Sequence, residues 1–417
     1  MSATASILSM TFSLLLILSG CLPPIQPPVV TPTPTPEPGL EQVTANRILV
    51  LGADGNLFTI MPDGSDRVNL TDDATPGRYY TQPTWSPTGE RIAWAEVSSA
   101  PGEMSGALIT AAADGSDRTR ANVTFPPFFL YWSPDGAQVA YLSNWLGSGA
   151  QTIALRVVDL RTGGADTKML GIGQPFYFSW APDSTQVLTH VANRRLGLLR
   201  LDGAETVLSE RTARFAAPQW STDGQHLLYA IHDDTIPQLV MADPAGNVKQ
   251  VVTLVAGDVR IAFSLSPDGE RIAYTETDAP VSVNSFGPLF VFDLASEEYE
   301  QLTTDPVVAF FWSNAGDALL YMTIDVAGDR PWLTPYVWDG AQKRPLGRFV
   351  PSGHFFNHYL PFADQYAQNM RFWSPDGRAI VYAGEDEQGR RGVWVQALDA
   401  AEPTFVAEGI VATWSPR

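Results

Sequence analysis

The residues best suited to metal chemistry are two closely spaced histidines, His354 and His358, in the stretch GHFFNHY. Imidazole nitrogens are common ligands of transition metals, and a His-x-x-x-His pair places both rings on one side of the chain when the segment is helical. The other three histidines are distant in the sequence, and no third ligand is evident. The pair therefore indicates a loop insertion with hydrogen-bonded histidines, and we predict no metal and no cofactor.

The remaining motifs do not favour catalysis by a nucleophilic side chain or by a pair of carboxylates. A serine hydrolase would need the Gly-x-Ser-x-Gly elbow, and this spacing does not occur. Asp135, Asp268 and Asp376 recur at one position of a repeated phrase, which is typical of turn-forming residues. The stretches at 61–67 and 112–118 contain Asp and Gly as calcium loops do, but they lack the closing Glu and indicate hairpins. We predict no catalytic residue.

Aromatic side chains concentrate in the longest unit of the chain, within the stretches 329–340 and 348–368. Insertions in repeat proteins form loops on one face, where aromatic residues anchor a partner or a sugar ring. The alternative is that these side chains pack the loop onto the rest of the fold. The candidate binding residues are Trp332, His354, Phe355, Phe356, His358, Tyr359 and Tyr366.

The elements that must position these residues belong to an internal repeat. A phrase of the form Trp-Ser-Pro-Asp-Gly, followed by an alternating apolar run, occurs eight times. Pro and Gly fix a tight turn, so each copy predicts a strand, a turn and a second strand. The first residues of the copies are Trp85, Trp132, Trp180, Trp220, Leu265, Trp312, Trp373 and Trp414. Because they share one position in the repeat, we expect them to pack between neighbouring units.

Successive copies are 40 to 61 residues apart, 47 on average, and further strand-like runs lie between them, as at 287–304 and 392–409. Four strands per unit of this length are typical of a β-propeller blade. A row of β-sandwich domains would need about twice this period. We predict an all-β protein built as a β-propeller.

The two ends of the array indicate the number of blades. The last copy supplies one strand before the chain ends, and residues 46–71 supply three strands with no opening phrase. If the C-terminal strand pairs with the N-terminal three, the ring closes without an incomplete sheet. We predict eight four-stranded blades. Seven blades are the alternative, if the long unit after Trp312 forms no blade of its own.

The phrase WSPDG followed by x-Ile-Ala-Tyr, with Asn-Leu-Thr at 69–71 and Gln-Leu-Thr at 301–303 ending units, resembles the TolB-type, WD-repeat-like propellers. The resemblance covers roughly residues 45–417. It implies a propeller in the periplasm or outside the cell that serves as a protein-binding platform, as an appendage of a peptidase or, in some members, as an enzyme. The motif is specific for the fold and not for a function.

The N-terminus indicates export. An apolar run from Ile7 to Leu18 precedes Leu18-Ser19-Gly20-Cys21, which resembles the bacterial lipobox, whose cysteine is lipidated and becomes the first residue of the mature protein. Cys21 is also the only cysteine of the chain. An ordinary signal peptide or a short membrane anchor are the alternatives. We predict a lipoprotein signal peptide at 1–20 and a lipid anchor on a bacterial membrane, facing the periplasm or the cell surface.

A stalk and one large domain follow. Proline recurs every second or third residue after Cys21, which favours an extended polyproline II segment, so we predict a Pro/Thr-rich stalk at 21–44 and the propeller at 45–417. With 45 acidic and 26 basic residues the formal charge is −19. Such a chain repels phosphates, so nucleic acid is excluded as a partner.

The sequence thus predicts a membrane-tethered, extracytoplasmic binding or scaffold module for a protein or a cell-envelope polymer. The alternative is a polysaccharide-acting lyase or hydrolase with its site at the mouth of the propeller pore. An enzyme would show a cluster of ionisable side chains there, whereas a binding module would show an apolar or aromatic patch.

Overall fold

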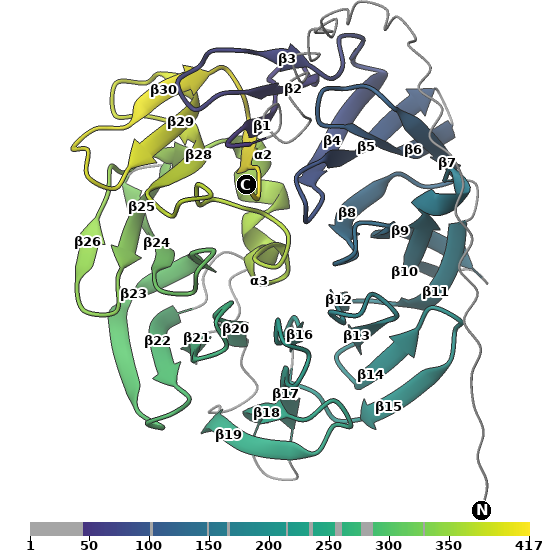
Figure 1. Ribbon diagram of the computed structural model, residues 1–417, viewed down its shortest axis with the longest axis vertical. Coiled ribbons are helices and arrows are strands. Elements are labelled where there is room, and N and C mark those ends of the chain that lie inside the picture. Colours follow the sequence, from purple (N-terminus) through teal and green to yellow (C-terminus); the bar gives the residue numbers. More distant parts are fainter. Residues whose placement is uncertain are drawn as a thin grey trace, which may run out of the picture. The chain divides into compact units, whose positions relative to one another are not determined.

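The computed structural model describes residues 45–100, 103–147, 150–164, 167–213, 216–232, 237–254, 261–276, 287–327 and 330–417. The predicted signal peptide and stalk, residues 1–44 with Cys21, lie outside this part of the chain. The strands of the described residues form six four-stranded sheets and one seven-stranded sheet. The sheets follow one another around a common centre (Figure 1). The all-β prediction is therefore confirmed.

In four of the six four-stranded sheets the strands follow one another along the chain without an insertion. Each of these sheets is a meander in which every strand pairs antiparallel with the next. In chain order their strands are β4 (Arg78–Trp85), β5 (Arg91–Ala100), β6 (Glu103–Ala112) and β7 (Thr119–Val123); β8 (Pro127–Trp132), β9 (Gln138–Gly147), β10 (Ala150–Asp159) and β11 (Thr167–Gly173); β12 (Phe176–Trp180), β13 (Gln186–Val191), β14 (Arg195–Arg200) and β15 (Glu205–Ser209); β16 (Gln219–Trp220), β17 (Leu227–His232), β18 (Pro237–Ala242) and β19 (Val248–Leu254). A short 3-10 helix, Leu160–Thr162, follows β10.

The seven-stranded sheet contains two such meanders that share one long strand. Its strands are β20 (Ile261–Leu265), β21 (Arg271–Glu276), β22 (Gly287–Asp293), β23 (Tyr299–Trp312), β24 (Leu319–Ala327), β25 (Arg330–Trp338) and β26 (Lys343–Pro345). The first part of β23, from Tyr299 to Thr303, pairs with β22, whereas its last part, ending at Trp312, pairs with β24. The unit after Trp312 thus has four strands of its own.

The chain ends meet in one sheet. The sheet before the seam contains β27 (Val350–Pro351), β28 (Ala379–Glu385), β29 (Arg391–Ala397) and β30 (Thr404–Ala407), and the closing sheet contains β1 (Ile48–Leu51), β2 (Leu57–Ile60), β3 (Val68–Asn69) and β31 (Val411–Trp414). Strand β31 pairs antiparallel with β1, with Ile48 opposite Trp414. This closure by one C-terminal and three N-terminal strands is consistent with the predicted eight blades.

The repeat tryptophans connect neighbouring blades through their indole N–H groups. The indole of Trp373 donates to the carbonyl of Phe311 at 3.0 Å, and that of Trp180 donates to the carbonyl of Tyr131 at 3.1 Å. The acceptor in each case is the residue directly before the repeat residue of the preceding blade, and Trp85, Trp132 and Trp312 follow the same rule. Each indole therefore satisfies a carbonyl on the innermost strand of the preceding blade.

The pattern changes where the repeat residue is Leu265, whose side chain has no N–H to donate. Here the side chain of Gln219 bridges the two blades, because its amide donates to the carbonyl of Phe263 at 3.0 Å and its oxygen accepts from the N–H of Leu265 at 2.9 Å. The indole N–H of Trp220 is buried and has no hydrogen-bond partner among the described residues.

The repeated aspartates stabilise the turns that follow the innermost strands. Asp135, Asp268 and Asp376 each accept a hydrogen bond from the serine hydroxyl two residues earlier, at 2.5, 2.5 and 2.6 Å. Each also accepts from a backbone N–H two residues later. This is the side-chain-to-backbone bonding by which aspartate favours turns.

One buried carboxylate is held by two arginines in the blade of β4–β7. The side chain of Glu96 on β5 is only 2% exposed and pairs with Arg120 at 2.6 Å and with Arg78 at 3.0 Å. The hydrogen bonds from Arg120, and next those from Arg78, lower the pKa of Glu96 to about 2, against the opposing effect of burial. Glu96 is therefore ionised at neutral pH.

Candidate functional site

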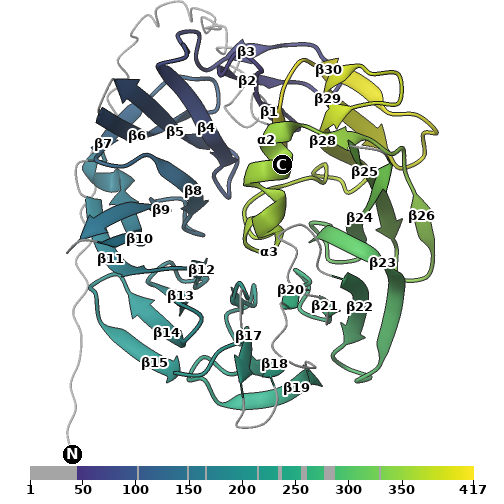
Figure 2. The ribbon, with the colours of Figure 1, turned by 180° about the vertical axis from the view of Figure 1, so that it is seen from behind.

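One insertion interrupts the regular succession of strands, at residues 352–371, which we call the plug. It lies between β27 and Trp373, and both of its flanks pair with β28: Pro351 is opposite Gly384 and Trp373 is opposite Ile380. The innermost strand of this blade is therefore split, and the plug leaves it and returns to it. Its helices lie at the centre of the ring of blades (Figures 1 and 2).

The plug consists of short helices. They are α2 (Gly353–His358), the 3-10 helix η2 (Leu360–Phe362) and α3 (Ala363–Tyr366). Ser352 caps α2, because its hydroxyl oxygen accepts from the N–H of Phe355 at 3.0 Å. The same hydroxyl donates to the carbonyl of Ile410 at 2.5 Å, which links the start of the helix to the last blade. Among the described residues no helix is both long enough and apolar enough to span a membrane.

Polar side chains of the plug bind the inner strands of three other blades. The amide of Gln365 donates to the carbonyl of Phe178 on β12 at 2.8 Å, and its oxygen accepts from the N–H of the same residue at 3.0 Å. The hydroxyl of Tyr366 donates to Gln82 on β4 at 2.8 Å. The amide of Asn369 donates to a carbonyl of β8. The plug therefore bonds to strands that are far from it in sequence.

Three of the predicted binding residues are enclosed by these contacts. Phe355, Tyr359 and Tyr366 are buried, and the rings of the two tyrosines lie 4.5 Å apart. The ring of Tyr366 also lies 5.1 Å from that of Phe129 on β8. Burial raises the pKa of both tyrosine hydroxyls, so both stay protonated at neutral pH. These three side chains pack the plug against the blades, and of the three only Tyr366 also lines a cavity.

The other aromatic candidates are placed differently. Phe356 is partly buried and packs against the same core. Trp332 is on β25, outside the plug, and the guanidinium groups of Arg348 and Arg330 lie 4.7 and 5.6 Å from the centre of its ring. The structure therefore groups six of the seven predicted residues in the plug and separates Trp332 from them.

The two histidines of the plug do lie on one side of α2. The ring centres of His354 and His358 are 4.7 Å apart. Burial, and to a smaller extent the neighbouring His358, lower the pKa of His354 to about 4, so this ring is neutral at pH 7. His358 is exposed. Among the described residues no group of three or more His, Cys, Asp or Glu side chains is placed to hold a metal ion.

A cavity of about 350 Å³, which we call the aromatic pocket, opens between the plug and the blades of β8 and β12. Its lining is mainly apolar and contains Gln82, Phe128, Phe129, Leu142, Ile153, Pro175, Phe176, Tyr177, Asn357, His358, Phe362, Gln365 and Tyr366. Phe128 is 37% exposed and Phe362 is 44% exposed. Phe128 is near the start of β8, so the pocket lies at the end of the inner strands opposite the Ser-Pro-Asp-Gly turns.

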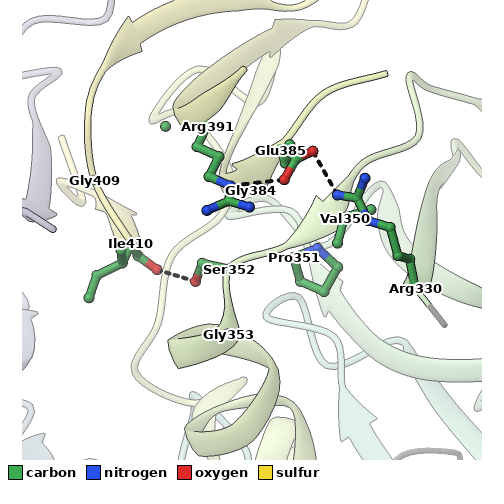
Figure 3. Close-up of a pocket in the computed structure, with 11 residues that line it drawn as sticks. Arg330, Val350, Pro351, Ser352, Gly353, Gly384, Glu385, Arg391, Gly409 and Ile410 are labelled. Atoms are coloured by element: carbon green, nitrogen blue, oxygen red, sulfur yellow. Dashed lines mark hydrogen bonds and ion pairs between the residues drawn. The ribbon is translucent and has the colours of Figure 1, made fainter. Parts of the chain in front are cut away.

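A second cavity, of about 390 Å³, lies beside the start of α2 and is lined by residues of β25, β27, β28 and β29 (Figure 3). The carboxylate of Glu385 lies between two arginines there, at 2.7 Å from Arg330 and 2.9 Å from Arg391. These two arginines, Arg330 first, lower the pKa of Glu385. Gly353 at the start of α2 lines this cavity, and His358 at its end lines the aromatic pocket, so the helix separates the two.

Comparison with solved structures supports the fold. The chain is similar to the dihydro-heme d1 dehydrogenase NirN in complex with DHE, at 14% identity and a TM-score of 0.58 over 89% of this chain and 74% of that one. It is also similar to the eukaryotic initiation factor, at 11% identity and a TM-score of 0.51 over 89% and 99%. The chain is a β-propeller. TolB from Acinetobacter baumannii matches this β-propeller at 16% identity and a TM-score of 0.42, over 77% of this chain and 82% of TolB.

No protein-family model matches the sequence of this β-propeller, and no curated protein matches it. Likeness to solved structures at identities below 25% shows the fold alone. The chemistry of the site must therefore be argued from the residues of this chain.

The sequence did not point to several residues of the aromatic pocket in this β-propeller. Phe128 follows a pair of prolines and is the second residue of the innermost strand β8, and every blade has residues at such a position. Phe362 is in the plug but is not among the candidate binding residues that the sequence indicated. Gln82 on β4 and Gln365 on α3 are polar residues in apolar surroundings, and this is the one signal that could have indicated them.

Proposed function

We propose that this β-propeller is a binding module, tethered to a bacterial membrane through lipidated Cys21 and exposed outside the cytoplasm. It takes an apolar or aromatic group of a protein partner or of a cell-envelope polymer into the aromatic pocket. The observation that carries the proposal is the composition of that pocket. Phe128 and Phe362, which are 37% and 44% exposed, line it, and no carboxylate, lysine or arginine is among the described residues that line it.

The physical basis is the burial of aromatic surface. Phe, Tyr and Trp rings bury large areas and dominate the energetics of interfaces, and exposed rings next to a preformed apolar cavity are costly unless a ligand covers them. The plug makes the pocket rigid, since Tyr366 and Gln365 in its wall are hydrogen-bonded to neighbouring blades. A preformed pocket reduces the entropy lost when the partner binds.

The plug and the ion pairs on its other side add a polar border to the same region. Arg330 and Arg391 flank Glu385 next to the start of α2 (Figure 3). Interfaces commonly combine an apolar centre with a polar rim, and the rim contributes orientation more than affinity. We infer that a partner seated in the aromatic pocket would contact this rim across α2.

A photo-crosslinking experiment tests the proposal for protein partners. A benzophenone amino acid replaces Phe362 in the full chain, produced in cells that make the protein, and in a control chain it replaces Tyr299, which is 69% exposed on β23. The expected result is a discrete crosslinked species from position 362 that position 299 does not give. Equal crosslinking from both positions, or none from 362, counts against a protein partner.

Polymer partners are tested by co-sedimentation of the full chain with insoluble peptidoglycan and with immobilised neutral and acidic polysaccharides. Phe128→Ser and Phe362→Ser should each weaken retention by about tenfold, in keeping with the loss of one buried aromatic anchor, and Tyr299→Ser should not. Retention that is unchanged in both pocket variants, together with a negative crosslinking result, overturns the proposal. New reducing ends or unsaturated products in the supernatant would instead favour the polysaccharide lyase or hydrolase.

A further inference from the structure

The opposite end of the inner strands holds another cavity, of about 360 Å³, which we call the turn-side cavity. The last part of the plug and the connection to Trp373 form one wall, and the ends of β20 and β23 with the turns that follow them form the other. The described residues that line it are Thr222, Ser264, Leu265, Pro267, Phe311, Trp312, Ser313, Asn314, Ala367, Gln368, Asn369, Met370, Arg371, Phe372 and Trp373.

Arg371 is the one charged side chain in this lining. Its guanidinium has no hydrogen bond or ion pair with any other residue that the structure describes, and the lining contains no carboxylate among those residues. In the cavity beside α2, by contrast, both lining arginines, Arg330 and Arg391, are paired with the carboxylate of Glu385. Arg371 is partly exposed, so its unpaired guanidinium can pair with an anion that enters the cavity.

The backbone of Arg371 is fixed where the plug meets the closing strand β31. Its N–H donates to the hydroxyl of Thr413 at 3.0 Å, and its carbonyl accepts from the N–H of Trp414 at 2.8 Å. The side chain thus begins from a fixed backbone beside strand β31. Desolvation lowers the pKa of Arg371, and the phenol of Tyr131 opposes this only in part.

We propose that the turn-side cavity binds a small monocarboxylate ligand, whose carboxylate pairs with the guanidinium of Arg371. One planar guanidinium matches the two oxygens of one carboxylate, and one positive charge balances one negative charge. Hydroxyl and amide groups of the lining, as in Thr222 and Gln368, suit a polar body such as that of a hydroxy acid or a sugar acid. This site is separate from the aromatic pocket.

The test is ligand-dependent thermal stabilisation of the full-length protein in detergent, with D-glucuronate, L-lactate, inorganic phosphate and uncharged glucose as probes. A ligand that binds only the folded state raises the melting temperature with concentration. We expect glucuronate or lactate to raise it and glucose to leave it unchanged. A rise with phosphate alone would overturn the monocarboxylate assignment, and no rise with any anion would overturn the site.

Two variants and one control assign the effect to Arg371. Arg371→Met should weaken carboxylate binding by about tenfold or more, as expected for the loss of a charge-assisted pair, and Arg371→Lys by less because a point charge remains. Arg371→Met should fold, and without ligand it should melt close to the wild type, because the guanidinium has no hydrogen bond or ion pair with the described residues to lose. In the matched control Arg330→Gln, the carboxylate response should persist. A response that survives Arg371→Met, or that is lost equally in Arg330→Gln, refutes the proposal.

Discussion

The side chain of Gln365 is expected to hold the plug in place, and Gln365→Leu removes its hydrogen bonds with little change in volume. In the native protein its side-chain oxygen accepts a hydrogen bond from the N–H of Phe178 at 3.0 Å, and its side-chain amide donates one to the carbonyl of Phe178 at 2.8 Å. Gln365 is only 3% exposed. The leucine can satisfy neither backbone group.

The magnitude follows from the two polar groups left without partners. A buried donor or acceptor that loses its partner lowers the free energy of unfolding by about 1 to 3 kcal/mol, so the two groups together lower it by about 2 to 6 kcal/mol when water reaches neither of them. Gln365 lines the aromatic pocket, from which water can reach part of the freed groups. We therefore expect the free energy of unfolding to fall by about 2 to 4 kcal/mol.

Urea unfolding of the full chain, followed by tryptophan fluorescence, measures this change. Hydrogen exchange of residues 353–373 measures release of the plug separately, since local opening precedes global unfolding in weakly held segments. The matched control is Gln342→Leu, at an exposed position before β26 whose side chain makes no hydrogen bond within the described residues. The reasoning is refuted if the free energy of unfolding of Gln365→Leu is within about 0.5 kcal/mol of that of this control and hydrogen exchange in the plug is unchanged.

Three further predictions concern the ring, one ion cluster and the anchor. Trp373→Phe removes the hydrogen bond to the carbonyl of Phe311 and leaves that buried carbonyl without a partner. It should lower the free energy of unfolding by about 1 to 3 kcal/mol more than Trp220→Phe, because the indole N–H of Trp220 has no partner among the described residues. Equal losses of unfolding free energy in urea would argue against a stabilising role of this hydrogen bond. The folded-state pKa of Glu96 is about 2, below the ordinary glutamate pKa of 4.5, so its stabilising contribution is complete above about pH 4.5 and is lost as the pH falls toward 2. Acid unfolding curves should therefore lose part of their pH dependence in Glu96→Gln, and an unchanged dependence would contradict this. Cys21→Ser should move the protein from the membrane fraction to the soluble fraction in cell fractionation, whereas persistence in the membrane would contradict lipidation.

The position of the plug at the centre of the ring could not be predicted from its own sequence. The aromatic residues of 353–366 indicate an insertion, but an aromatic side chain on an exposed loop and one buried in the centre of a ring have the same local sequence. Phe355, Tyr359 and Tyr366 are buried because strands β4, β8 and β12 surround them, and those strands lie more than 170 residues earlier in the chain. Burial of this kind depends on closure of the ring.

The two histidines illustrate the same limit at closer range. Their spacing predicts rings on one side of a helix, and the structure has them 4.7 Å apart on α2. Their environments differ, because the blades desolvate His354 and leave His358 exposed. A pKa depends on surroundings that come from distant parts of the chain.

By itself the sequence determined the repeat, the turn in each unit, the all-β class and the pairing of the two chain ends, because turn chemistry and strand alternation are local properties that recur at a fixed period. Only the tertiary structure decided where the plug lies, which residues line the aromatic pocket, and that the guanidinium of Arg371 is without a partner among the described residues. Gln82, Phe128 and Phe362 meet at one pocket although the first and last are 280 positions apart. The physical reason is that enclosure, desolvation and charge pairing arise between blades, and they exist only once the ring has closed.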